Sequence, residues 1–321
     1  MQDQTVMENE ATAEISVPMV IRKPKMTLGR KLFIIGMLIV PICSFLLFYV
    51  YVNFNSILMA FQQVKNGKTI FTFENFRMLF RDFANPYSVM KESLVNTLIF
   101  FSVNLFIMIP LTAIFSYFIY KRVFGYKFFR VVFFLPSIIS AVIMTMLYRY
   151  LLSVDGPIVA LLVNLFNLEA KPEIFGDSRY ALAAIVIYGI WTGFGSNLIL
   201  FNGAISRIPE EIIEAGMLDG VGMFRELVQI VIPLMWPTLS TIIIFACVGI
   251  FTASGPILLF TKGEFGTYTI SFWIFMQVYD RAAGGSYEYA SAVGLFFTLI
   301  GFPIVMVVKH FLTKFGQDIT Y

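Results

Sequence analysis

The feature that most limits the fold of this chain is a set of long stretches that are apolar and almost free of charge. Residues 32–61, for example, contain no Asp, Glu, Lys, Arg or His. A helix needs about 20 mostly apolar residues to cross a bilayer, and the length of these stretches and their lack of alternation favour helices over strands. The sequence predicts six membrane-spanning helices, at residues 32–61, 95–120, 128–152, 180–206, 234–260 and 288–312.

The composition agrees with a protein that crosses the membrane several times. Of the 321 residues, 58% are hydrophobic and 13% are charged, whereas an ordinary soluble domain has roughly a quarter charged residues. Such a chain has too little polar surface to remain soluble as a monomer. The net charge of +3 is too small to indicate binding to nucleic acid. We therefore expect an all-α membrane protein surrounded by lipid.

Lysine and arginine residues set the predicted orientation, because they are enriched on the cytoplasmic side of membranes. They cluster before the first span, between the second and third spans, and after the sixth span. This pattern predicts that the terminal tails, residues 1–31 and 313–321, face the cytoplasm. Residues 62–94 then form an extracytoplasmic segment, although they also carry basic residues. Within the core, residues 95–312, the loop at about 207–233 faces the cytoplasm.

The spans lack the groups on which ion-coupled transport usually depends. Residues 95–120, 180–206 and 234–260 contain no Asp, Glu, Lys, Arg or His. Proton- and ion-coupled carriers commonly place an ionisable group at membrane depth. An ion-coupled carrier that acts alone therefore stays an alternative function only because neutral oxygen atoms can also bind sodium.

The sequence predicts no catalytic, metal or nucleotide site in this chain. Gly67-Lys68-Thr69 resembles the end of a phosphate-binding loop, but that motif needs a glycine where Gln62 stands. The single histidine, His310, makes neither a metal site nor a catalytic triad. We expect no enzyme activity and no cofactor, so energy for uphill transport has to come from a partner.

A charged segment, "EEIIEAGMLDGVGMFRELVQIVIPLM" at residues 210–235, interrupts the apolar sequence. Residues 208–218 have the pattern of a short helix, with Ile208, Ile212 and Ala215 on an apolar side. Pro209 suits its first turn, and Asp219-Gly220 predicts a turn after it. A second amphipathic stretch leads to Pro233, so we expect a cytoplasmic helix–turn–helix between the fourth and fifth spans.

This segment resembles the "EAA" loop of the membrane permeases of binding-protein-dependent ABC importers. The pattern Glu-Ala-Ala-x3-Gly-x9-Ile-x-Leu-Pro is matched by Glu214, Ala215, Gly216, Gly220, Ile230, Ile232 and Pro233, with Asp219 also fitting. Gly216 replaces the second alanine, which costs a helix roughly 1 kcal/mol, and Ile232 replaces leucine. The resemblance implies the type I ABC importer fold and a place in the plasma membrane of a bacterial cell.

Other segments resemble the carbohydrate-uptake subfamily: "LVNTLIF" at 94–100, "FFRVVFFLPSIISAVIMTMLYRYLL" at 128–152, "GIWTGFGSNLILFNGAISRIPEEIIEAGMLDG" at 189–220 and "YASAVGLFF" at 289–297. "TKGEFGTYT" at 261–269 departs from the subfamily's Gly-Gly-Pro. The resemblance implies a second homologous permease, two ATPase subunits that bind ATP and Mg, and an extracytoplasmic solute-binding protein. It also implies that Glu214, Ala215, Gly216, Asp219 and Gly220 contact an ATPase, with Glu214 as the main contact.

The resemblance further implies that the span before the loop lines a carbohydrate site. The corresponding residues are Gly189, Thr192, Gly193 and Ser196, with Thr252 and Ser254 added from the fifth span and Tyr188 or Trp191 as possible stacking partners. Small residues also mediate helix–helix contacts in membranes, so packing stays an alternative role. Glycerol phosphate or another polar solute stays an alternative cargo, although phosphate would favour Arg or Lys at mid-depth.

Overall fold

The computed structural model describes residues 27–65, 67–252, 254–279 and 285–316. The chain divides into two units, Met1–Phe54 and Asn55–Tyr321. In the first unit lie α1 (Leu28–Ser44) and the π-helical segment η1 (Phe45–Tyr51), which bury none of their residues. Their apolar side chains are therefore left exposed, as a lipid-facing helix requires.

The second unit is helical except for one two-stranded hairpin in the described part of the chain. Beginning with the helix that crosses the boundary of the units, its elements are α2 (Val52–Ala60), β1 (Gln62–Lys65), β2 (Lys68–Phe71), α3 (Glu74–Ala84), α4 (Val89–Val103), η2 (Asn104–Met108), α5 (Ile109–Tyr120), α6 (Tyr126–Ile138), α7 (Ala141–Leu151), α8 (Pro157–Phe166), α9 (Ala181–Ile205), α10 (Glu210–Leu218), α11 (Met223–Glu226), η3 (Leu227–Val231), α12 (Ile232–Leu234), α13 (Trp236–Val248), α14 (Ile257–Phe260), α15 (Ile270–Tyr279) and α16 (Tyr287–Gly316).

Four helices among the described residues are long and apolar enough to cross a membrane. They are Leu28–Ala60, Val89–Tyr120, Ala181–Ile205 and Tyr287–Gly316, which confirms the first, second, fourth and sixth predicted spans. The second span begins six residues before the predicted boundary at 95, at Val89. Two bent helix pairs raise the total to six if each pair counts as one span.

The third predicted span, residues 128–152, is not one continuous helix. The pair α6 and α7 bends by 112° at its break. Pro136 lies inside α6, where a proline removes a backbone N–H and clashes with the preceding turn. Ile139 and Ser140 then adopt extended ψ angles of 146° and 131°. An apolar pattern alone does not reveal such a break, because both halves remain apolar.

The fifth predicted span, residues 234–260, is bent near its start and ends earlier than predicted. The helix pair Met223–Leu234 and Trp236–Val248 bends by 75°. Pro237 has no N–H to donate to the carbonyl of Pro233 one turn earlier, which explains the break near Met235. The helix then ends at Val248. The following small residues, with Gly255 at φ 50° and Pro256 at the start of α14, disfavour its continuation.

The β hairpin and the helices α3, α8 and α15 were absent from the sequence-based prediction. Lys65 of β1 pairs with Lys68 of β2, and Gly67 has a φ of 73°, so the segment that resembles a phosphate loop is a hairpin turn. The helices α8 and α15, each ten residues long, are apolar but too short to cross a bilayer.

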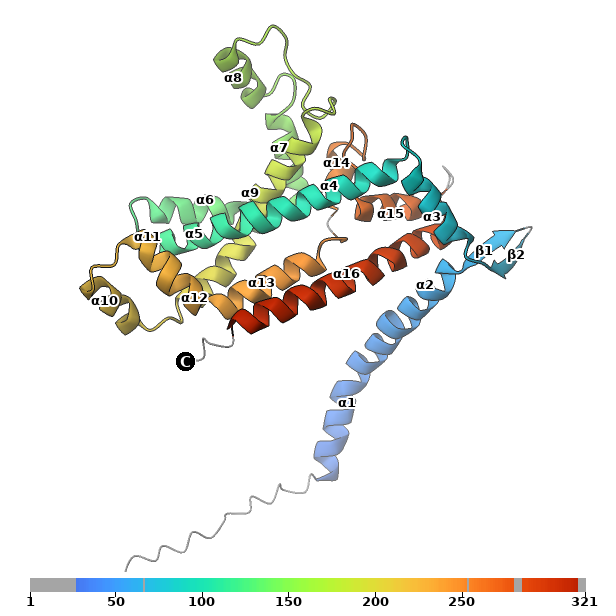
Figure 1. Ribbon diagram of the computed structural model, residues 1–321, viewed down its shortest axis with the longest axis horizontal. Coiled ribbons are helices and arrows are strands. Elements are labelled where there is room, and N and C mark those ends of the chain that lie inside the picture. Colours follow the sequence, from blue (N-terminus) through green and yellow to red (C-terminus); the bar gives the residue numbers. More distant parts are fainter. Residues whose placement is uncertain (1–26, 66, 253, 280–284, 317–321) are drawn as a thin grey trace, which may run out of the picture. The chain divides into compact units, whose positions relative to one another are not determined.

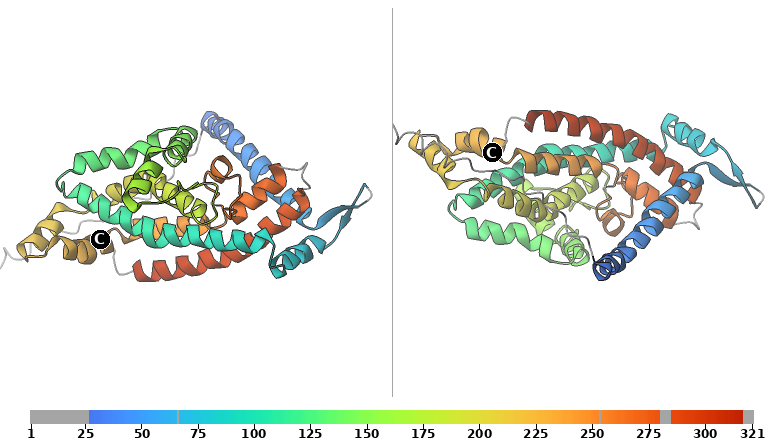
Figure 2. Two further views of the ribbon diagram at one scale, coloured as in Figure 1. Left: turned by 90° about the horizontal axis from the view of Figure 1, so that it is seen from above. Right: turned by 90° about the horizontal axis from the view of Figure 1, so that it is seen from below.

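The long helices of the second unit pack side by side. The helix α9 contacts both α5 and α6, and α13 runs along α16 (Figure 1). Figure 1 places α10 and α11 at one end of this unit and α3 with the β hairpin at the other end, and the two views of Figure 2 agree. Segments that the sequence assigns to opposite sides of the membrane thus lie at opposite ends.

Candidate functional site

The charged segment folds into the predicted helix–turn–helix, residues 208–234. Its first helix, α10, begins after Pro209 and has Glu210 and Glu211 in its first turn, where acidic groups interact favourably with the helix dipole. At its end the N–H of Gly220 donates to the carbonyl of Met217, and that of Val221 donates to the carbonyl of Gly216. These two bonds form a Schellman motif.

The glycine of the motif at position 220 has a structural role in that turn. Gly220 has a φ of 72°, in the left-handed region that glycine adopts without steric cost. The chain can therefore reverse directly after α10 and enter α11 at Met223. The predicted turn at Asp219-Gly220 is confirmed.

The inward face of α10 differs from the predicted one. Ile208, just before α10, is buried as predicted. Within α10, however, Ile213 and Gly216 are the buried residues, whereas Ala215 is exposed and Ile212 is only half-buried. A Cβ on Gly216 would lie 2.8 Å from Cδ1 of Ile230. Gly216 of α10 therefore packs against η3, and the absence of a side chain lets these two helices approach closely.

The outer surface of the helix–turn–helix is both acidic and apolar. Glu210, Glu211 and Glu214 are exposed on α10. Near the turn, Leu218 is 89% exposed and Phe224 is 76% exposed. Large apolar side chains beside carboxylates at a protruding end are typical of a protein-contact surface.

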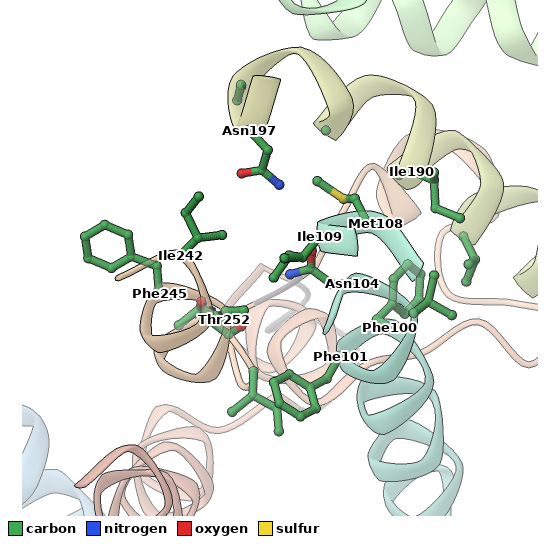
Figure 3. A pocket seen from close by; sticks show the side chains of 18 of the residues that line it. Phe100, Phe101, Asn104, Met108, Ile109, Ile190, Asn197, Ile242, Phe245 and Thr252 are labelled. Carbon is green, nitrogen blue, oxygen red and sulfur yellow. Dashed lines mark hydrogen bonds between the residues drawn. The ribbon is translucent and has the colours of Figure 1, made fainter. Parts of the chain in front are cut away.

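A cavity of about 510 Å³ lies between η2 with the end of α4, α9 and α13. This volume falls within the roughly 300–1,000 Å³ of small-molecule pockets. The lining is mainly apolar, and its polar side chains are those of Asn104, Ser196, Asn197 and Thr252. Figure 3 shows the amides of Asn104 and Asn197 reaching into the same space from different helices.

Four of the six small residues predicted to contact substrate line this cavity, Gly189, Gly193, Ser196 and Thr252, whereas Ser254 is outside the lining. Thr192 lies outside the lining and its hydroxyl donates to the carbonyl of Tyr188, 2.9 Å away. It faces its own helix because a threonine hydroxyl readily satisfies the carbonyl one turn earlier. The proposed contact of these residues with substrate stays a prediction.

The aromatic residues predicted to stack on a sugar lie elsewhere. Tyr188 is buried and its hydroxyl lies 3.0 Å from that of Thr145. Trp191 packs against the apolar cluster that contains Tyr188. The aromatic lining comes instead from Phe100, Phe101 and Phe245. Sequence reasoning missed these three residues, and it also missed Asn104 of η2.

Asn104 and Asn197 carried a sequence signal that was not used. Each amide stands in a long uncharged apolar stretch, where a polar group is costly unless it has a partner. Asn104 also begins the π-helical segment η2, and π-bulges are frequent at functional sites. Asn197 lies one turn after Gly193, on the same face of α9.

The described residues contain no cluster of three or more His, Cys, Asp or Glu side chains able to hold a metal ion. No Asp, Glu, Lys, Arg or His is among the lining residues of the cavity that the structure describes. The arrangement is thus an uncharged cavity, suited to a neutral polar molecule, and a separate contact surface at one end of the unit.

Residues 111–319 match the family model of "Binding-protein-dependent transport system inner membrane component". This chain belongs to that family. It is therefore a multi-pass membrane component of a transport system, as its apolar helices also indicate.

Curated relatives of this family member carry sugar-transport names. It is 28% identical to the multiple sugar-binding transport system permease protein MsmF of Streptococcus mutans, over 58% of this chain and 63% of MsmF. It is 26% identical to the polygalacturonan/rhamnogalacturonan transport system permease protein YteP of Bacillus subtilis, over 89% of each chain. With the maltose/maltodextrin permease protein MalF of Vibrio parahaemolyticus the identity is 28%, over 60% of this chain and 38% of MalF.

Solved structures share the fold of this family member. A chain of a bacterial ABC transporter involved in the import of the acidic polysaccharide alginate superimposes with a TM-score of 0.76 at 22% identity. The superposition covers 89% of this chain and 96% of the other. The expected type I ABC importer fold is therefore confirmed.

Proposed function

We propose that this chain is the permease subunit of an ATP-driven importer and forms, with a second homologous permease, the path for a carbohydrate. Membership of the binding-protein-dependent family carries this proposal. The names of the relatives support a sugar as cargo, although the chain spans 63% of MsmF and 38% of MalF. The inferred partners are two ATPase subunits, which bind ATP and Mg, and an extracytoplasmic solute-binding protein.

The helix–turn–helix is the inferred contact with an ATPase. Glu214, Ala215 and Asp219 are exposed on and after α10, and Leu218 and Phe224 add apolar surface at the turn. Gly216 and Gly220 have structural roles in this element. Gly216 is buried against η3, and Gly220 makes the turn. When the ATPases close on ATP, they would move this element and with it the attached helices.

The chemistry of the cavity favours an uncharged cargo that is rich in hydroxyl groups. Asn104 and Asn197 supply amides that both donate and accept hydrogen bonds, while Phe100, Phe101 and Phe245 supply apolar faces. A phosphate or carboxylate group would require a cationic side chain for binding, and the described lining contains none. A neutral oligosaccharide therefore fits better than glycerol phosphate, and the open backbone at Gly189 leaves room for a ring.

The proposed orientation puts the helix–turn–helix and both termini in the cytoplasm. The basic residues near the ends of the spans support it, as does the position of α10 and the β hairpin at opposite ends of the second unit. In this orientation the hairpin and α3 face the extracytoplasmic binding protein.

Reconstitution tests the proposal. The chain is purified with its second permease and ATPase subunits, placed in proteoliposomes, and given its binding protein with a radiolabelled neutral oligosaccharide chosen by calorimetry on that binding protein. We expect uptake only with ATP and the binding protein present, and none with glycerol phosphate. Uptake by the chain alone, driven by an ion gradient, would overturn the proposal.

A further inference from the structure

A buried ion pair joins the helix–turn–helix to the second span. Nζ of Lys121, directly after α5, lies 2.6 Å from Oε1 of Glu226 at the end of α11. The side chains are only 13% and 3% exposed. One turn earlier, the hydroxyl of Tyr117 donates to the carbonyl of Met223 over 3.1 Å. Two polar contacts thus connect the same face of α5 to the same short helix.

The second span needs such contacts if it is to follow the helix–turn–helix. The backbone leads from α9 directly into α10 and from α12 directly into α13, so those spans are attached covalently. The helix α5 has no such connection, since it ends at Tyr120 and the chain continues into α6. Whether α5 moves with the element is therefore decided by noncovalent contacts.

One stripe of side chains links this ion pair to the cavity. Ile109, Ala113, Tyr117 and Lys121 follow one another at four-residue steps and therefore share a face of the helix. The first three are buried in the cluster that also contains Ile213 of α10. At the far end of the stripe, Ile109 lines the cavity together with the residues of η2. A displacement of the Lys121 end of a rigid helix would therefore reach the cavity wall.

Resting on the proposed function, we propose that the Lys121–Glu226 ion pair is the tie that makes the second span move with the helix–turn–helix as one body. Apolar packing permits sliding, because its energy depends mainly on buried area. A buried charge pair does not, because separating its members leaves each charge without its counter-charge in a poorly solvated site. Both residues are positioning residues, since neither lines the cavity.

Distance measurements on the assembled transporter test the tie. In a background with Cys43→Ser and Cys247→Ala, spin labels are placed at Phe106→Cys on η2 and Ile199→Cys on α9, both exposed. With the tie intact, the distance between them should be the same without nucleotide and with ATP bound. In Glu226→Gln we expect it to shift or broaden on ATP binding, with uptake lowered at least about tenfold.

Three variants make this result specific. The swap Lys121→Glu with Glu226→Lys should restore both the constant distance and at least about a third of uptake. Lys171→Met breaks an ion pair of similar length, 2.7 Å to Asp155, whose members are exposed, and should change neither readout. If Glu226→Gln does not assemble, Lys121→Met with Glu226→Leu is measured in its place, because apolar replacement of both partners preserves folding better than loss of one.

The outcomes separate the tie from the proposed function. A purely structural pair would lower thermal stability while the label distance stayed insensitive to ATP in every variant, and this result would overturn the tie. ATP-independent uptake by the unmodified transporter would instead overturn the proposed function, whatever the labels report. A second pair of spin labels, at Ile199→Cys and Val248→Cys, lies on the two helices that the backbone connects to the helix–turn–helix. The response of this label distance to ATP should be the same in all variants.

Discussion

The side chain of Met108 occupies the space in front of Gly193. A Cβ on Gly193 would lie 2.6 Å from Cε and 3.2 Å from Sδ of Met108. Both residues line the cavity, so the glycine makes room for a flexible thioether. The second span and α9 thus meet at a contact that can rearrange without breaking a hydrogen bond, since methionine adapts readily to altered surroundings.

Gly193→Ala should push Met108 into the cavity. We expect cargo affinity in the uptake assay to fall about threefold to tenfold, which corresponds to roughly 0.6–1.4 kcal/mol. Adding Met108→Ala should restore affinity to within about twofold, because the displaced side chain is then gone. Gly193→Trp should abolish uptake while the ATPase subunits still copurify. Normal uptake by the tryptophan variant would remove α9 from the path.

Asn104→Ala should weaken cargo binding if the amide contacts a hydroxyl. The loss of one neutral hydrogen bond costs about 0.5–1.5 kcal/mol, so the concentration for half-maximal uptake should rise about twofold to tenfold. Ser102→Ala is the matched control, because Ser102 is exposed near the end of α4 and lies outside the lining. Equal effects of the two substitutions would argue against a contact with cargo.

Glu214→Ala should leave the protein in the membrane but uncouple ATP hydrolysis from uptake. Coupling energies of about 1–3 kcal/mol are typical between linked sites, so we expect uptake to fall at least about fivefold. The control Glu211→Ala removes another exposed carboxylate of α10 and costs only about 0.3–1 kcal/mol of helix stability. The measurement is ATPase stimulation by the loaded binding protein alongside uptake. Unchanged uptake in Glu214→Ala would exclude the assigned role.

Gly216→Ala and Ile230→Val should interact in a double-mutant cycle. Alanine stabilises a helix interior by about 1 kcal/mol relative to glycine, but its Cβ would meet Cδ1 of Ile230 at 2.8 Å. We therefore expect little change in the apparent Tm for Gly216→Ala alone. Valine lacks that terminal methyl, so the alanine should raise the Tm clearly in the Ile230→Val background. Additive changes in Tm would show that α10 and η3 do not contact each other through these two residues.

Elements whose signals are local in the chain were predictable. The uncharged stretch of α9 and the Pro209 and Asp219-Gly220 boundaries of α10 follow from helix physics that acts within a few residues, and both helices were found where expected. The resemblance at Glu214-Ala215-Gly216 also depended on a short spacing. These features are determined by the sequence by itself.

Features that depend on contacts between distant segments were decided only by the tertiary structure. The 112° bend between α6 and α7 separates two apolar halves that look alike in sequence. Tyr117 and Met223, whose contact accompanies the ion pair, are 106 positions apart. The cavity likewise brings Asn104 and Asn197 together from separate helices. Hydrophobic periodicity reports which face of a helix avoids water, but in a membrane nearly every face is apolar, so packing alone selects which helix each face meets.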